Sequence, residues 1–250
     1  MNKMEDILHT FWTGGLDSTF NLIQLLTNSN NMVQPHYIVR HEDSTGIEID
    51  AMIRMRREIV RRFPEVRERF LPTIYFNEDL IPRFQEVDDE IEELRKIGKV
   101  REQYQILAHY CKEFNLKKVD LGLIKENYLP MKASGLFEHF KNSAAFGSFR
   151  YPIVDLTKQD FFQVANSNGW DDILLMTSFC RRPIKKITPC GVCGPCSDTV
   201  KSGIGFRFPF KSKVKARIQI PFRRYYRNNY HKQDKTWLFR MIKKRYEGKF

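Results

Sequence analysis

The sequence predicts an α/β fold with a mostly parallel sheet and helices on both faces. Short apolar runs alternate with amphipathic helical patterns along the chain, which is the order of a parallel sheet with helical crossovers. A glycine turn joins the first apolar run to the first helical pattern. A chain of 250 residues with 42% hydrophobic residues is long enough for one such domain with appendages.

The first half of the chain contains two strand–helix pairs and a third strand. Residues 7–12 form an apolar run that ends at the glycine turn, and apolar side chains then recur at helical spacing until residues 28–31. Residues 33–40 predict a second strand and residues 46–63 a helix with a basic outer face, ended by Pro64. Residues 71–76 predict the third strand.

The second half is less regular. The patterns predict helices at 86–97 and 100–114, a fourth strand at 118–124 and an extended segment at 151–155. Residues 127–148 show no regular pattern, and we expect part of a substrate pocket there. Thr157 is the expected N-cap of a helix over 157–166.

The net charge of +12 is concentrated at the C-terminal end. Residues 201–250 hold sixteen Lys or Arg, two Asp or Glu and eleven aromatic residues, so the remaining chain is close to neutral. Cations interleaved with rings suit single-stranded nucleic acid or tRNA, an anionic membrane surface, or a partner protein or second subunit. Packing of this segment back onto the body is the remaining alternative. We expect three parts: an α/β domain at 1–176, a cysteine region at 177–200 and a basic extension at 201–250.

No run of 18 apolar residues is present, so no transmembrane helix is expected, and residues 1–6 do not resemble a secretory signal. We therefore expect a cytoplasmic protein. Four of the five cysteines lie within 17 residues, which in a reducing compartment indicates metal binding and not disulfides.

The glycine turn, residues 13–18, reads Thr-Gly-Gly-Leu-Asp-Ser. Gly14 and Gly15 allow the backbone to approach an anion closely, and the following helix offers unpaired N–H groups to that anion. Hydroxyl donors stand at Thr13, Ser18 and Thr19. The turn has neither the lysine of a P-loop nor the spacing of a dinucleotide-binding turn, so both of those enzyme classes lose support.

The cysteine cluster consists of Cys180, Cys190, Cys193 and Cys196, with glycines and a proline between the last three. Four thiolates complete a closed tetrahedral shell, which is typical of a structural zinc site. An iron–sulfur cluster is the alternative, because the C-x2-C-x2-C spacing also occurs in ferredoxins. Cys111 lies in an apolar helical pattern and is expected in the core.

The glycine turn resembles the S-G-G-x-D-S loop of the PP-loop ATP pyrophosphatases, with Thr13 in place of the first serine. The resemblance implies an adenine-nucleotide alpha hydrolase-like, Rossmann-like fold and an ATP- and Mg²⁺-dependent adenylation that releases pyrophosphate. It also implies that the turn holds ATP, with Asp17 near Mg²⁺ and with Asp17 and Ser18 in catalysis. The implied contacts are Thr13, Gly14, Gly15, Leu16, Asp17, Ser18 and Thr19.

The turn and the cysteine spacing together resemble the 7-cyano-7-deazaguanine synthase family of queuosine biosynthesis, over residues 5–200. Residues 151–158 and 171–180 add to the resemblance. It implies that ATP adenylates a small carboxylate, that ammonia gives the amide, and that a second adenylation gives the nitrile. It further implies a zinc knuckle and a homodimer. The candidates for polar contacts near the bound ATP are Lys158, as a catalytic residue, and Arg40 and His41, as ATP contacts.

Two departures from that family leave the acceptor open. Residues 122–132 lack the family's Cys-Arg substrate element, and the basic extension follows the knuckle. The alternatives are the same adenylation chemistry on a nucleic-acid base (as in tRNA modification), a protein terminus or an acidic sugar, or a non-catalytic nucleotide-binding module.

Overall fold

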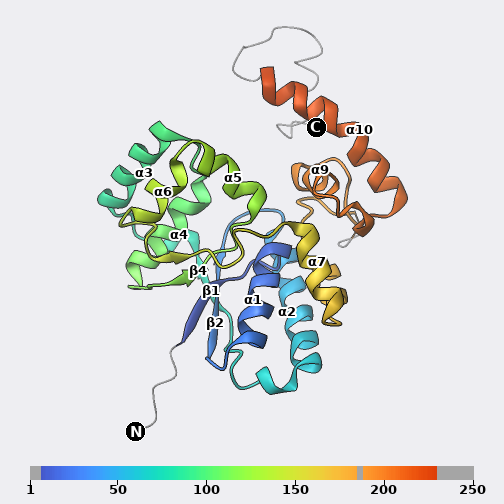
Figure 1. The fold of residues 1–250 in the computed structure, drawn as a ribbon, viewed down its shortest axis with the longest axis horizontal. Coiled ribbons are helices and arrows are strands. Elements are labelled where there is room, and N and C mark those ends of the chain that lie inside the picture. Colours follow the sequence, from blue (N-terminus) through green and yellow to red (C-terminus); the bar gives the residue numbers. More distant parts are fainter. Residues whose placement is uncertain (1–6, 185–187, 230–250) are drawn as a thin grey trace. The chain divides into compact units, whose positions relative to one another are not determined.

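Five parallel strands form one sheet in the order β3-β2-β1-β4-β5 (Figure 1). The predicted α/β class is confirmed, and the sheet is parallel throughout. β1 and β2 carry the central pairing, with Phe11 opposite His36, while β4 and β5 contribute two residues each. The strands are β1 (Leu8–Phe11), β2 (Val33–Val39), β3 (Ile74–Asn77), β4 (Val119–Asp120) and β5 (Phe149–Arg150).

The computed structural model describes residues 7–184 and 188–229, with side chains to residue 222 in the last helix. The chain divides into two units, Met1–Ser178 and Phe179–Phe250. The first unit contains the sheet and α1 (Leu16–Asn28), α2 (Thr45–Arg62), α3 (Gln85–Ile97), α4 (Glu102–Glu113), α5 (Lys125–Ala133), α6 (Leu136–Asn142), α7 (Lys158–Ser167) and α8 (Asp171–Leu175). The second unit contains α9 (Gly194–Lys201) and α10 (Phe210–Asn229). Residues 230–250 of the expected basic extension lie outside the described residues.

Alternating side chains of β2 explain why helices cover both faces of the sheet. His36 points toward α4, where its Nδ1 lies 2.8 Å from the Tyr110 hydroxyl. The next residue, Tyr37, points to the opposite face and donates from its hydroxyl to Glu48 of α2 at 2.9 Å. Because neighbouring residues of a strand face opposite sides, one strand packs against both helical layers. Figure 1 shows α1 and α2 on one side of β1 and β2 and α4 on the other.

Two predicted elements are wrong. Residues 127–148 are not irregular, because α5 and α6 occupy most of that stretch; their helical pattern is short, and Pro130 interrupts α5. Residues 151–155 form turns and not an extended segment, since β5 ends at Arg150. The expected helix over 157–166 is confirmed as α7, with Thr157 as its N-cap.

No helix among residues 7–184 and 188–229 is both long enough and apolar enough to cross a membrane. The expectation of no membrane-spanning helix therefore holds for the described part of the chain.

A pair of histidines lies in the centre of the sheet. His36 is buried, and its Nε2 lies 2.9 Å from Nδ1 of His9. Burial, with a smaller contribution from His9, lowers the pKa of His36 from 6.5 to about 4. The His36 ring is therefore neutral in the folded chain at pH 7. Protonation at low pH would place a positive charge in the buried interior, away from water, which costs free energy.

We predict that acid destabilises the first unit through His36. The unfolded chain takes up this proton near pH 6.5, whereas the folded chain takes it up only near pH 4. The free energy of unfolding should thus fall as the pH drops from 6.5 to about 4, by about 3 kcal/mol in total for this group. Urea unfolding across that range measures the loss. His36→Gln should flatten the pH dependence, whereas His41→Gln, on an exposed histidine, should leave it as in the wild type. Equal slopes for the wild type and His36→Gln would contradict the assignment.

Candidate functional site

A cleft of about 300 Å³ opens at the carboxyl ends of β1 and β2. The turn after β1 forms one wall, and residues at the starts of α2 and α4 form the others. In this strand order β2 and β3 are added on one side of β1, and β4 and β5 on the other, so the strand order reverses between β1 and β4. Ligands of open parallel α/β sheets bind at the carboxyl ends of the strands at such a reversal. The cleft is therefore the candidate functional site of the first unit.

Gly14 is required by the conformation of the turn. It has a φ of +67°, and a Cβ on it would lie 2.9 Å from the carbonyl oxygen of Glu48. The Ser178 amide donates to the Gly14 carbonyl at 2.8 Å, which fixes the turn from its other side. Gly15 is the N-cap of α1, and no side chain caps this helix. The first turn of α1 can therefore present backbone N–H groups to an anion in the cleft.

The two hydroxyls of the turn contact each other. Thr13 Oγ1 lies 3.2 Å from Ser18 Oγ, and the Thr13 amide donates to the same Ser18 oxygen at 3.2 Å. Both residues line the cleft, as do Gly15, Leu16 and Asp17. Thr19 does not line it: its hydroxyl is buried and accepts a hydrogen bond from Trp12 Nε1 at 3.0 Å. Five of the seven predicted turn residues thus line the cleft, while Gly14 shapes the turn and Thr19 belongs to the core.

Lys158 and Asp17 come together from distant parts of the sequence. The Lys158 ammonium lies 3.8 Å from Asp17 Oδ1, and both side chains are about three-quarters buried. Lys158 is the first residue of α7, where Thr157 and Asp160 form a reciprocal capping box that fixes the start of the helix. A cation and a carboxylate therefore stand together beside the glycine turn.

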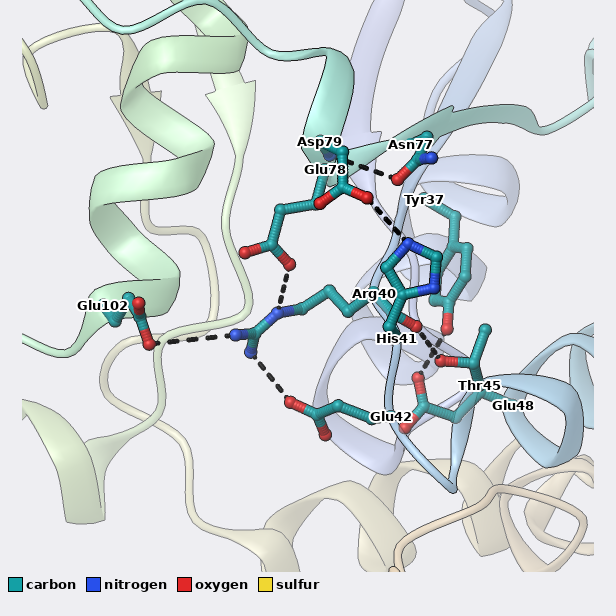
Figure 2. Close-up of polar contacts among 10 residues, drawn as sticks. All are labelled: Tyr37, Arg40, His41, Glu42, Thr45, Glu48, Asn77, Glu78, Asp79 and Glu102. Carbon is teal, nitrogen blue, oxygen red and sulfur yellow. Dashed lines mark hydrogen bonds and ion pairs between the residues drawn. The ribbon is translucent and has the colours of Figure 1, made fainter.

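Arg40 lies at the centre of a ring of carboxylates at the edge of the cleft (Figure 2). Its guanidinium contacts Glu78 at 2.6 Å, Glu42 at 3.0 Å and Glu102 at 3.9 Å. Burial opposes the charge of Arg40, but the hydrogen bond from Arg40 to Glu78, together with the nearby carboxylates, raises its pKa. His41 points away from this ring to an exposed pair with Asp79 at 2.8 Å and does not line the cleft. Of the two predicted ATP contacts after β2, only Arg40 reaches the cleft wall.

The structure adds cleft residues that the sequence did not single out. Glu48 is hydrogen-bonded to Tyr37, and burial raises the pKa of its carboxyl group. Arg101 and Tyr104 reach the cleft from the start of α4. No sequence motif marks Glu48, Arg101 or Tyr104. The strand order alone brings together the loops after β1 and β2 and the start of α4. The one available signal was the position of Arg101 and Tyr104 at the start of a predicted helix.

The four clustered thiols of the second unit converge on one point. Their sulfur atoms all lie within 4.8 Å of one another, and Cys193 Sγ lies 3.3 Å from Cys196 Sγ and 3.9 Å from Cys180 Sγ. Zn–S bonds of about 2.3 Å in a tetrahedron place the sulfurs about 3.8 Å apart. The four residues therefore fit a metal ion such as zinc, and a shell of four thiolates leaves no open position on it.

Backbone N–H groups and apolar side chains surround the sulfurs. The Cys190 amide donates to Cys180 Sγ at 3.2 Å, and the Val192 amide donates to Cys190 Sγ at 3.4 Å. Such donors stabilise thiolates in a metal shell. Phe208 packs against the cluster.

Cys111 is not part of the cluster. It is buried in the apolar core of the first unit, and burial raises the pKa of its thiol. The expectation that it is a core residue is confirmed.

Comparisons with protein-family models, with curated proteins and with solved structures find no match to this chain. The parallel sheet with its cleft and the cluster of four thiols are therefore the features on which a functional assignment rests. Neither of these two features is sufficient to identify a substrate, because proteins of one fold carry out many different activities.

We predict that the second unit depends on a bound metal. Cys193→Ser should lower the zinc content by more than tenfold and destabilise this unit, because the free energy of metal binding becomes folding free energy. Plasma mass spectrometry of the purified protein measures the metal, and thermal unfolding measures the stability. Cys111→Ser is the matched control and should keep the metal content of the wild type. Unchanged metal in Cys193→Ser would exclude the cluster as the site.

Proposed function

We propose that the chain is an ATP-dependent adenylating enzyme of the PP-loop type. The observation that carries the proposal is the turn at residues 13–18, which joins β1 to α1 and lines the cleft at the reversal of strand order. Its glycines, hydroxyls and helix N–H groups suit the phosphates of ATP. The adenine-nucleotide alpha hydrolase-like fold is the corresponding proposal for the first unit.

Each charged group beside the turn has a proposed role. The N–H groups of Gly15 and Leu16 and the hydroxyls of Thr13 and Ser18 bind phosphate oxygens. Lys158 neutralises negative charge that develops as the α–β phosphate bond breaks. Asp17 holds Mg²⁺, which accompanies the nucleotide, and orients the Lys158 ammonium through their contact.

The proposed reaction activates a carboxylate for reaction with ammonia. A carboxylate oxygen attacks the α-phosphorus of ATP, and pyrophosphate leaves. Ammonia then attacks the acyl carbon, loses a proton and displaces AMP, which leaves an amide. Adenylation of the amide oxygen by a second ATP, followed by loss of AMP and a proton, gives a nitrile. In the 7-cyano-7-deazaguanine synthase assignment, the starting acid is 7-carboxy-7-deazaguanine.

One observation favours the alternative acceptors. The chain after β4 forms α5 and contains no Cys-Arg element for a deazaguanine, and Asn127 is the residue of α5 that lines the cleft. The same adenylation could then act on a nucleic-acid base, a protein terminus or an acidic sugar. The ATP chemistry is common to all of these acceptors.

We propose zinc as the metal of the cysteine cluster. The sulfur spacing suits one metal atom with four thiolate ligands. A 4Fe–4S cluster places each thiolate on a separate iron and a 2Fe–2S cluster divides the four thiolates between two irons, so both spread the sulfurs farther apart. The metal has a structural role in this proposal. Thiolate ligands are consistent with a reducing compartment, so a cytoplasmic location is part of the proposal. A homodimer is also part of the proposal.

We predict that Asp17→Ala abolishes pyrophosphate release while the chain stays folded. Loss of the metal-binding carboxylate should lower the rate by at least about a hundredfold. The assay follows pyrophosphate and AMP with ATP, Mg²⁺, ammonium and 7-carboxy-7-deazaguanine. Asp79→Ala, on an exposed aspartate that pairs with His41, is the control and should turn over as the wild type.

The same assay separates the acceptors. Formation of the nitrile, seen by mass spectrometry, would support the deazaguanine assignment. ATP binding without nitrile would retain the turn assignment and direct the search to another acceptor. Wild-type protein that binds no ATP, or Asp17→Ala with unchanged turnover, would overturn the proposed function.

A further inference from the structure

The exposed face of α10 is apolar where an ordinary surface helix is polar. Phe210, Val214, Ile218 and Phe222 are 80%, 38%, 54% and 40% exposed, respectively. They follow one another at four-residue steps, so they form one slowly winding stripe along the helix. We call these four residues the apolar stripe.

The buried positions of the same helix carry small or polar side chains. Ser212, Ala216 and Gln219 are the residues of α10 that are buried among those whose side chains are described. The usual amphipathic arrangement, with large apolar residues inside, is therefore reversed. Contiguous apolar surface of this kind marks an interaction site.

Cations border the apolar stripe on both sides. At 100° per residue, Lys211 and Lys215 lie along one edge, Arg217 lies along the other, and all three are exposed. The sequence has no Asp or Glu between Asp198 and Asp234. The partner of this face must therefore be both apolar and anionic.

The cysteine cluster holds the helix in place within the second unit. α10 packs against α9, which begins directly after Cys193. Gly191, between two of the cysteines, has a φ of +75°, and a Cβ on it would collide with the carbonyl oxygen of Ser212. The face that carries Ser212 is thus fixed against the knuckle, which leaves the apolar stripe on the outside.

We propose that the apolar stripe of α10 and its bordering cations bind the surface of an anionic lipid bilayer. Val214 and Ile218, at the centre of the stripe, are aliphatic and cannot stack on nucleic-acid bases, whereas binding of single strands relies on aromatic stacking. An apolar helix face edged by Lys and Arg lies in the interface of an anionic membrane, with the apolar side chains among the acyl chains. The apolar stripe belongs to the second unit, and its proposed role goes beyond the proposed activity.

The test is flotation of the full-length protein with lipid vesicles. We expect binding to phosphatidylcholine vesicles with about 30% phosphatidylglycerol, weaker binding at high salt, and little binding to phosphatidylcholine alone. Lys211→Glu/Lys215→Glu should weaken binding by more than about tenfold. Val214→Ser/Ile218→Ser should do the same at unchanged net charge.

Matched variants in the first unit control for charge and for exposed apolar area. Lys99→Glu/Lys141→Glu makes the same change of net charge at two exposed lysines, and Leu80→Ser removes an exposed apolar side chain. Both should bind vesicles as the wild type. Zinc content and thermal unfolding of all variants report whether the second unit stays folded.

Four outcomes would overturn the proposal. One is a wild-type protein that does not float with anionic vesicles. Another is binding that the stripe and lysine variants leave unchanged. The third is binding to a single-stranded oligouridine, without vesicle binding, that is lost in Lys211→Glu/Lys215→Glu; this would assign the face to nucleic acid. A wild-type dimer that dissociates in Val214→Ser/Ile218→Ser, without vesicle binding, would assign it to a second copy.

Discussion

The candidate cleft depends on the close approach of three chain segments to one glycine turn. Gly14 has a positive φ and has no room for a Cβ beside the Glu48 carbonyl, and its own carbonyl accepts from Ser178. On the β4 side, a Cβ on Gly122 would lie 3.3 Å from the Ser18 amide nitrogen. The turn is therefore enclosed by backbone from α2, from the chain after α8 and from the chain after β4. These three contacts are with backbone, and hydrogen bonds between the Thr13 and Ser18 side chains add to them within the turn.

The two units differ in the interactions that stabilise them. In the first unit, large apolar side chains are buried on both faces of the sheet, and polar pairs such as Asp17–Lys158 lie among partly buried residues. Among the described residues, the apolar cluster of the second unit is small and consists mainly of the four clustered cysteines with Phe179, Val192, Val200 and Phe208. A metal ion held by these four cysteines would therefore add stability that so small a cluster does not provide. The position of α10 within this unit is tied to the cysteine cluster by the close approach of Gly191 to Ser212.

Local patterns predicted the parts of the structure that local chemistry controls. The glycine turn and the Thr157 cap depend on residues that are close in sequence, and the convergence of the four cysteines follows from a spacing typical of metal sites. The cleft could not be predicted in the same way. Arg101 and Tyr104 become its neighbours only through the strand order, and His41 was placed there only because it follows Arg40. α5 was missed because Pro130 and a weakly amphipathic sequence conceal it, and its packing against α6 replaces the missing local preference.

The ring of carboxylates around Arg40 limits what this residue can contribute to nucleotide binding. In the present arrangement Glu78 and Glu42 already satisfy the guanidinium. A phosphate that displaces one of them replaces one charge-assisted hydrogen bond by another, so the exchange adds little net affinity. It also leaves the displaced carboxylate to be solvated near the phosphate, which costs free energy. Arg40 is thus better suited to orient the wall of the cleft. The affinity for an anion would have to come from the amides of the turn and from Lys158, whose contact with Asp17 is longer at 3.8 Å. The arrangement of charges therefore favours an anion at the β1 turn, next to the N-terminus of α1 and the Lys158–Asp17 pair.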